Sequence, residues 1–259
     1  MADLKLLERL CTAQGISGDE GAVREMILEE ITPYAESVTV TPLGNIIAEK
    51  KGAQRAKTRL LLNAHMDEVG MIVTSITKEG LLRFTPVGGI DRRILPGKSV
   101  MVAGSIPGVI GAKPIHLLEG DEREKAPSLD SLTIDIGALS QEEAEKLVSP
   151  GDSVTFVSLF DTAHGMIRSR AIDDRAGCAI LIDLMKKELP YDCTFVFAVQ
   201  EEVGLRGSKT AAFAAKPEAA IVVESTTAAD IAGVDPDKQV CRVGKGPVLS
   251  FMDRATIYD

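Results

Sequence analysis

Four short motifs rich in carboxylates stand at the ends of apolar runs, and one of them carries a histidine. They are Ala64-His65-Met66-Asp67-Glu68, Ala171-Ile172-Asp173-Asp174-Arg175, Gln200-Glu201-Glu202-Val203-Gly204 and Val222-Val223-Glu224-Ser225. One imidazole and several carboxylates are ligands that suit zinc, cobalt or manganese in hydrolytic sites. Each residue alone is as typical of a solvated surface, but their shared position predicts a metallohydrolase.

The motifs can form one site only if the strands that precede them end close together in the fold. Two short apolar segments predict buried strands, at Arg59 to Ala64 and Thr194 to Val199, and Ala219 to Val223 predicts a further strand. In an open α/β sheet, ligand sites form at the carboxyl ends of the strands. We therefore expect His65, the pair Glu201 and Glu202, and Glu224 to converge on one crevice.

The two residues of each acidic pair can have different roles. Asp173 and Asp174 precede a helix predicted from Gly177 to Lys187. A carboxylate there could bridge two cations or could simply cap the helix, and the local pattern leaves both open. Successive side chains of a regular strand point in opposite directions. One of Glu201 and Glu202 is therefore expected to bind metal while the other transfers protons.

The remaining pattern predicts an α/β domain interrupted by an all-β insert. Further predicted elements of the α/β part are a helix over residues 3 to 13, a second helix capped by the box Ser17-Gly18-Asp19-Glu20 and ended by Pro33, a hairpin of Ser37 to Thr41 with Asn45 to Glu49, and a helix from Ser208 to Ala215. The insert has strands at Met71 to Ile76, Leu81 to Pro86, Ser99 to Ala103, Val109 to Ala112 and Ser153 to Val157, and one helix, residues 141 to 148, capped by Ser140. We place the α/β domain at 1–70 and 163–259 and the β-rich insert at 71–162.

Composition excludes several classes of partner. The 259 residues carry a net charge of −9 and only 4% aromatic residues, which argues against binding to nucleic acid or to an anionic membrane. Nowhere do 18 apolar residues follow one another, and no signal peptide is recognised. The four cysteines form no C-x-x-C pair, which is typical of reduced thiols. A soluble, cytoplasmic protein is expected.

The ordered motifs resemble one known family. Together with Gly15-Ile16-Ser17-Gly18-Asp19-Glu20, Val87-Gly88-Gly89-Ile90-Asp91 and Lys113-Pro114-Ile115-His116, they are similar to the di-metal aminopeptidases that assemble into tetrahedral particles. Relatives have been labelled glutamyl aminopeptidases, deblocking aminopeptidases and endoglucanases. The resemblance spans essentially the whole chain. It implies a zinc-peptidase-like α/β catalytic domain, with a mixed sheet flanked by helices, and a barrel-like β insert that mediates oligomerisation.

The resemblance also implies roles for individual residues. His65 and Glu224 would hold one cation, zinc or cobalt or else manganese, and Asp173 would bridge it to a second that Glu202 also binds. Glu201 would be the general base and acid. Asp67 would orient the imidazole of His65, and the peptide bond between Asp173 and Asp174 would be cis. Peptides are the implied substrates, and dimers assembling into a tetrahedral dodecamer are the implied homo-oligomer.

Two expectations qualify this assignment. Relatives continue beyond the segment that resembles Gly246-Pro247-Val248-Leu249-Ser250 and supply a final histidine ligand, whereas this chain ends at Asp259 with only His116 and His164 besides His65. One metal site is therefore expected to be incomplete, which makes a catalytically impaired metal-binding form the first alternative. A glycoside hydrolase using Glu201 and another carboxylate is the second alternative.

Overall fold

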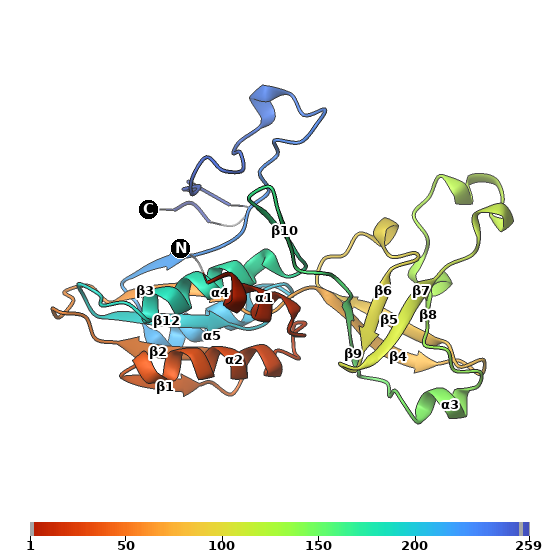
Figure 1. Cartoon of the computed structure of the whole chain (residues 1–259), viewed down its shortest axis with the longest axis horizontal. Coiled ribbons are helices and arrows are strands. Elements are labelled where there is room, and N and C mark those ends of the chain that lie inside the picture. Colours follow the sequence, from red (N-terminus) through yellow and green to blue (C-terminus); the bar gives the residue numbers. More distant parts are fainter. Residues whose placement is uncertain (1–2, 254–255, 259) are drawn as a thin grey trace. The chain divides into compact units, whose positions relative to one another are not determined.

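The computed structural model describes residues 3–253 and 256–258, which form two units (Figure 1). The first ends at Glu224 and contains a mixed sheet with its helices and a closed β-barrel. The second begins at Ser225. The α/β fold class with an all-β barrel, predicted from the sequence, is confirmed. The domain boundaries assigned from the sequence stay a prediction.

The mixed sheet has the strand order β1-β2-β12-β3-β13. Its strands are β1 (Ser37–Val40), β2 (Ile46–Lys50), β3 (Leu60–His65), β12 (Cys193–Ala198) and β13 (Ala219–Val222). β1 and β2 form the predicted hairpin, and β2 runs antiparallel to β12. β3 is parallel to both β12 and β13. The carboxyl ends of these three strands therefore meet at one edge of the sheet.

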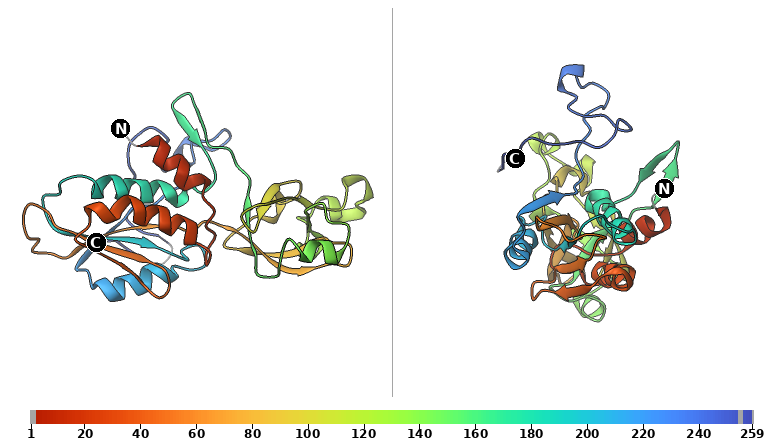
Figure 2. Two further views of the ribbon diagram at one scale, coloured as in Figure 1. Left: turned by 60° about the horizontal axis from the view of Figure 1, so that its bottom comes forward. Right: turned by 90° about the vertical axis from the view of Figure 1, so that its left-hand side faces the viewer.

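Helices cover both faces of this sheet (Figure 2). The helices are α1 (Leu4–Thr12), α2 (Gly21–Ile31) and α4 (Ile172–Met185) on one face and α5 (Arg206–Ala215) on the other. Phe195 and Phe197 of β12 pack in the core of the first face, and Val196 packs with Ala211 of α5. Because successive residues of β12 are buried on opposite faces, the strand is a continuous apolar run.

The helix over residues 3 to 13 is confirmed, but the capping box after it is not. Asp3 caps α1, accepting hydrogen bonds from two backbone N–H groups of the first turn. α2 starts only at Gly21, and Ser17 does not cap it. Instead Ser17 donates to Asp67, and Glu20 is buried and accepts from the backbone N–H groups of Gly18 and Gln200. Tertiary partners have replaced the local ones that the box motif predicts.

α4 begins earlier than the predicted start at Gly177. Its first turn contains Asp173 and Asp174, whose backbone angles are not helical. The peptide bond between them is cis, as the family resemblance implies. Cys178, Leu181 and others of its buried side chains then pack against the sheet.

The barrel closes in the strand order β4-β5-β8-β7-β6-β9. Its elements are β4 (Gly70–Ile76), β5 (Leu82–Val87), β6 (Ser99–Val102), β7 (Ile106–Gly111), β8 (Thr133–Asp135), β9 (Ser153–Phe156) and helix α3 (Gln141–Glu145). Ser140 caps α3 as predicted, accepting from the N–H of Glu143. β8 is too short for its alternation to be recognised in the sequence, although Ile134 is fully buried in the barrel core.

Outside the sheet and the barrel the chain forms small elements. They are the hairpin of β10 (Asp161–Ala163) with β11 (Met166–Arg168), and 3₁₀ helices η1 (Thr32–Tyr34), η2 (Arg92–Ile94), η3 (Ile115–Leu117), η4 (Gly120–Arg123), η5 (Leu129–Ser131) and η6 (Pro236–Lys238). The described residues of the second unit include η6 and an antiparallel bridge between Met252 and Ile257. Among the residues described, no helix has both the length and the apolar character needed to cross a membrane.

Candidate metal centre

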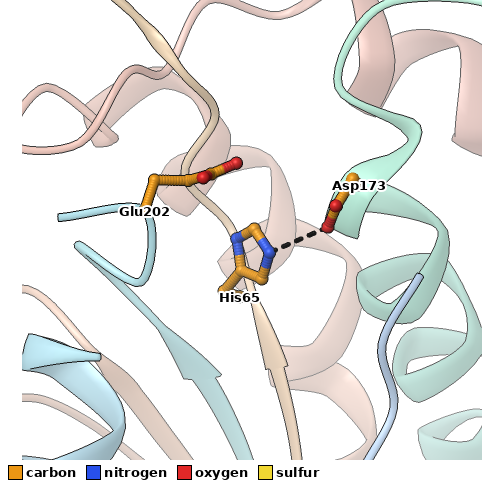
Figure 3. Close-up of side chains that lie close together, drawn as sticks. All are labelled: His65, Asp173 and Glu202. Carbon is orange, nitrogen blue, oxygen red and sulfur yellow. Dashed lines mark hydrogen bonds and ion pairs between the residues drawn. The ribbon is translucent and has the colours of Figure 1, made fainter. Parts of the chain in front are cut away.

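His65, the last residue of β3, is the centre of a group of carboxylates. Its side chain is 2% exposed, and its Nε2 atom lies 3.0 Å from Oδ1 of Asp173 (Figure 3). The same nitrogen lies 3.5 Å from Oε1 of Glu224 and 4.0 Å from Oε2 of Glu201. Carboxylates from three separate chain segments therefore converge on one imidazole nitrogen.

The parallel pairing of the strands explains this convergence. The pairing of β3 with β12 continues past the strand ends, because Met66 donates to the carbonyl of Ala198 at 2.8 Å. On the other side of β3, Val223 donates to the carbonyl of Asn63, also at 2.8 Å. The residues that directly follow are those of the predicted motifs, so the sheet edge places Glu224 and the Glu201 segment on either side of His65.

Asp67 connects three parts of the site. It is fully buried, and Nδ1 of His65 lies 3.1 Å from its backbone carbonyl and 3.5 Å from its Oδ1. The same oxygen accepts from the N–H of Glu201 at 2.9 Å, while Oδ2 accepts from the N–H of Glu202 at 3.1 Å and from the hydroxyl of Ser17 at 2.5 Å. Burial opposes ionisation of Asp67, but the hydrogen bonds from His65 and Ser17 outweigh it and lower the pKa. The carboxylate is thus held ionised behind the imidazole.

The acidic pair at the start of α4 divides into two different environments. The Asp173 side chain is 57% exposed and faces His65. Asp174 is fully buried, and its oxygens accept from the N–H groups of Gly177 at 3.0 Å and His65 at 3.2 Å. Burial, followed by the charge of Glu224, raises the pKa of Asp174 to about 8. The capping interpretation left open by the sequence therefore fits Asp174, whereas Asp173 presents a carboxylate to the imidazole.

Glu201 and Glu202 do not lie on a strand, so the strand-alternation argument for their separate roles was wrong. β12 ends at Ala198, and Gln200 has a positive φ of 53° that turns the chain. Burial raises the pKa of Glu201 above its usual range, and burial together with the Asp173 and Glu201 charges raises that of Glu202 to about 7. The Glu202 carboxyl can therefore exchange protons near neutral pH.

The donor atoms fit a cation with nitrogen and oxygen ligands. Two ligands at about 2.0–2.2 Å from a tetrahedral ion lie roughly 3.4 Å apart. The 3.0 and 3.5 Å separations from His65 Nε2 to Asp173 and Glu224 bracket that value. Burial disfavours protonation of His65, but hydrogen bonds that its ring donates to Asp173, Asp67 and Glu224 outweigh burial and hold its pKa far above the usual range. Such concentrated negative charge favours a cation.

The structure brings together the six residues to which the family resemblance gives roles, which are His65, Asp67, Asp173, Glu201, Glu202 and Glu224. In the part of the chain that the structure describes, two groups of side chains have potential ligand atoms within 4.8 Å of one another. They are His65 with Asp173 and Glu202, and His65 with Asp174 and Glu224. His116 and His164 belong to neither group.

Sequence reasoning missed a layer of charged residues directly behind the site. Glu68 is buried between Arg170, at 2.6 Å, and Arg175, at 3.5 Å. Both arginines also donate to backbone carbonyls at the end of α1. They flank the Asp173-Asp174 pair in the sequence, and that adjacency was the available signal.

A family model for M42 glutamyl aminopeptidases matches residues 44–259. The chain belongs to this family. It is 41% identical over 254 residues to a putative aminopeptidase from Acetivibrio thermocellus, covering 97% of this chain and 74% of that protein. Among solved structures, it is 42% identical to a Thermotoga maritima protein described as an endoglucanase, with a TM-score of 0.82, covering 96% of this chain and 74% of the other.

A second solved structure is a TET1 peptidase of Pyrococcus horikoshii that can assemble into a tetrahedron or a large octahedral shell. It is 42% identical, with a TM-score of 0.77, covering 85% of this chain and 68% of that one. The prediction of a metal-dependent aminopeptidase is confirmed by family membership. Neither alternative is favoured. For a glycoside hydrolase, two carboxylates would face each other across an open gap, whereas these surround one imidazole.

Proposed function

We propose that this aminopeptidase hydrolyses the N-terminal peptide bond at the centre built around His65. The observation that carries the proposal is the convergence of Asp173, Glu224 and Glu201 on Nε2 of His65, while Asp67 faces the opposite nitrogen of the ring. A histidine whose second nitrogen faces a carboxylate is the usual arrangement of a metal ligand.

The proposed ligands supply two cation positions. His65, Asp173 and Glu224 would hold one cation, and Asp173 with Glu202 would hold the other. Asp174 is left out although its oxygens are close, because both already accept backbone hydrogen bonds. Imidazole and carboxylate ligands suit zinc and cobalt, with manganese as a third candidate.

Glu201 is the proposed proton carrier. Bound cations would lower the pKa of a water toward about 7 and polarise the peptide carbonyl. Glu201 would accept a proton from the attacking water and deliver it to the leaving amine, a task for which a carboxyl group with a raised pKa is suited. The backbone N–H of Glu201 donates to Asp67, which fixes the start of its side chain beside His65.

Removal of metal tests this function. In excess Co²⁺ or Zn²⁺ the protein should release the chromophore from amino-acid p-nitroanilides. A chelator should abolish the reaction, and added metal should restore it, because the proposed residues supply no covalent nucleophile. Full activity after exhaustive chelation, or cleavage of β-glucan without cleavage of peptides, would contradict the proposal.

The two cations should bind with unequal affinity. Within the described residues, one has three protein ligands, whereas the other has only Asp173 and Glu202. Metal analysis after dialysis should therefore approach one tight equivalent per chain, with turnover rising when excess metal fills the second position. Two equivalents that both survive dialysis would show that a further ligand completes the second site.

A homo-oligomer with a β-rich interface is the proposed assembly, since the related Pyrococcus horikoshii peptidase can assemble into a tetrahedron or a large octahedral shell. Residues 71–162 are the proposed contact region. Its six strands close into a barrel, so unpaired strand edges give no support for this contact. Family likeness alone supports the contact. Light scattering should give a mass several times that of one chain, and a monomer at all concentrations would refute the proposal.

We place the protein in a reducing compartment such as the cytoplasm. Cys11, Cys178, Cys193 and Cys241 are all free thiols in the structure, and the first three are buried. Buried thiols of this kind behave as small apolar side chains.

A further inference from the structure

The connection between α1 and α2 lies directly against the chain that leaves β3. Glu68 donates to the carbonyl of Gly15 at 3.0 Å, and Ser17 donates from its N–H to the carbonyl of Glu68 at 3.3 Å. These two bonds form a short parallel bridge around Ile16. The backbone of residues 15–17 is therefore fixed to the segment that follows His65.

The Ser17 side chain extends this attachment to the carboxylate of Asp67. Its hydroxyl donates to Oδ2 of Asp67 at 2.5 Å. The same carboxylate lies 3.5 Å from Nδ1 of His65, which is also 3.1 Å from the backbone carbonyl of Asp67, and it accepts from the N–H groups of Glu201 and Glu202. The rotation of the carboxylate about its Cβ–Cγ bond therefore sets its distances from the His65 ring and from the backbone N–H groups of Glu201 and Glu202. Within the described residues, Ser17 is the one side chain whose hydroxyl donates a hydrogen bond to the Asp67 carboxylate.

The carboxylate of Glu20 attaches the end of the α1–α2 connection to the segment that carries Glu201 and Glu202. Glu20 is 3% exposed, and its Oε1 accepts from Gly18 at 2.8 Å and from Gln200 at 3.1 Å. Gln200 immediately precedes Glu201. The connection is thus held against both segments that carry site residues, which limits how far Ser17 can move away from Asp67.

We propose that Ser17 is a positioning residue of the metal centre. Its hydroxyl holds the Asp67 carboxylate in the rotation that orients the His65 imidazole and receives the amides of Glu201 and Glu202. This inference rests on the proposed function, because it assumes that His65 binds metal. Outer partners of a ligating histidine commonly change metal affinity or activity by about 10–100-fold, and Ser17 lies one step beyond Asp67, so roughly tenfold is expected.

The affinity of the folded protein for Co²⁺ is a readout that a loss of folding stability alone does not change. Co²⁺ is titrated into the metal-free full chain, followed by its visible absorption and by competition with a chelator of known affinity. Ser17→Ala should weaken Co²⁺ binding roughly tenfold and alter the absorption band. Ser17→Thr keeps the hydroxyl and should restore wild-type binding. Ser17 is half-buried and lines an open cleft of about 890 Å³ together with residues 151–153, so it is not enclosed in a packed core.

Two further variants separate positioning from folding. Ser140→Ala removes a comparable serine hydrogen bond, the cap of α3 in the barrel, and should leave Co²⁺ binding unchanged. If Ser17→Ala does not fold, Ser17→Cys replaces it, because a thiol has a similar size but is a weak donor. Ser17→Cys should then show the weakened binding.

The outcomes distinguish this inference from the proposed function. Wild-type affinity in Ser17→Ala or Ser17→Cys would overturn the inference alone. So would an affinity in Ser17→Thr as low as that in Ser17→Ala, since the hydroxyl would then not be the group that matters. A wild-type protein that binds no Co²⁺ would overturn the proposed function and the inference with it.

Discussion

Replacing Glu201 with glutamine should lower kcat by at least roughly 10²–10⁴, the usual loss when a general base is removed, and should leave the metal content unchanged. Glu201 lies 4.0 Å from Nε2 of His65, farther than the proposed ligands Asp173 and Glu224. The amide keeps the shape of the carboxylate but cannot carry the proton. Stopped assays with an amino-acid p-nitroanilide in excess cobalt, paired with metal analysis of the same sample, measure both quantities.

Glu202→Gln is the matched control for this experiment, because it makes the same chemical change one residue away. It should weaken the binding of the second cation and lower activity mainly at limiting metal, with partial recovery at high metal concentration. Loss of metal from Glu201→Gln together with full retention in Glu202→Gln would reverse the two assignments.

Replacing Arg175 with methionine should lower the free energy of unfolding by roughly 3–5 kcal/mol, the range found when one partner of a buried ion pair is removed. Arg175 is fully buried and donates to the carbonyls of Leu10, Ala13 and Gly15. Methionine fills much of the space but removes the guanidinium from these carbonyls and from buried Glu68. Among the described residues, only two of the carbonyls keep a second donor, since Ala13 accepts from Arg170 and Gly15 from the N–H of Glu68. Urea unfolding of the metal-free protein measures the change.

Arg168→Met is the control for the arginine substitution. Its guanidinium is 77% exposed and pairs with Asp161 at 3.2 Å, so a change within about 1 kcal/mol is expected for this surface pair. Equal urea midpoints for Arg175→Met and Arg168→Met would show that the buried contacts contribute no more than the exposed one.

The sequence was sufficient to predict the sheet edge and the identity of its functional side chains. Strands such as Thr194 to Val199 are recognisable because burial on both faces makes them continuously apolar, and the polar residue that follows must then lie at the sheet edge. His65 was predictable for the same reason. The regular local patterns around α1 and at the cap of α3 were also reliable.

Two of the errors share one physical cause, which is that long-range partners outcompeted local ones. Ser17 and Glu20 match a capping box, but their side chains bond to Asp67 and to the Gln200 backbone instead. Neither partner is near in sequence, so no local pattern could reveal the choice. The burial of Arg175 was missed because its partners lie about 160 residues earlier, as in its bond to Gly15 at a separation of 160. Charged residues are mostly exposed, and a sequence does not show the exceptions.

The closure of the barrel also bears on how the chain acquires its site during folding. His65 and Asp173 are 108 residues apart, and the barrel occupies most of that interval. Its first and last strands, β4 and β9, pair with each other, so Met71 lies opposite Val154. Once the barrel has formed, only the short segments outside it remain to be ordered. The entropic cost of bringing these two residues together then falls by about 1 kcal/mol, since it grows with the logarithm of loop length. Folding of the barrel before the sheet would thus speed assembly of the site. A short turn joining residues 70 and 155 would shorten the same loop and could replace the barrel in this role.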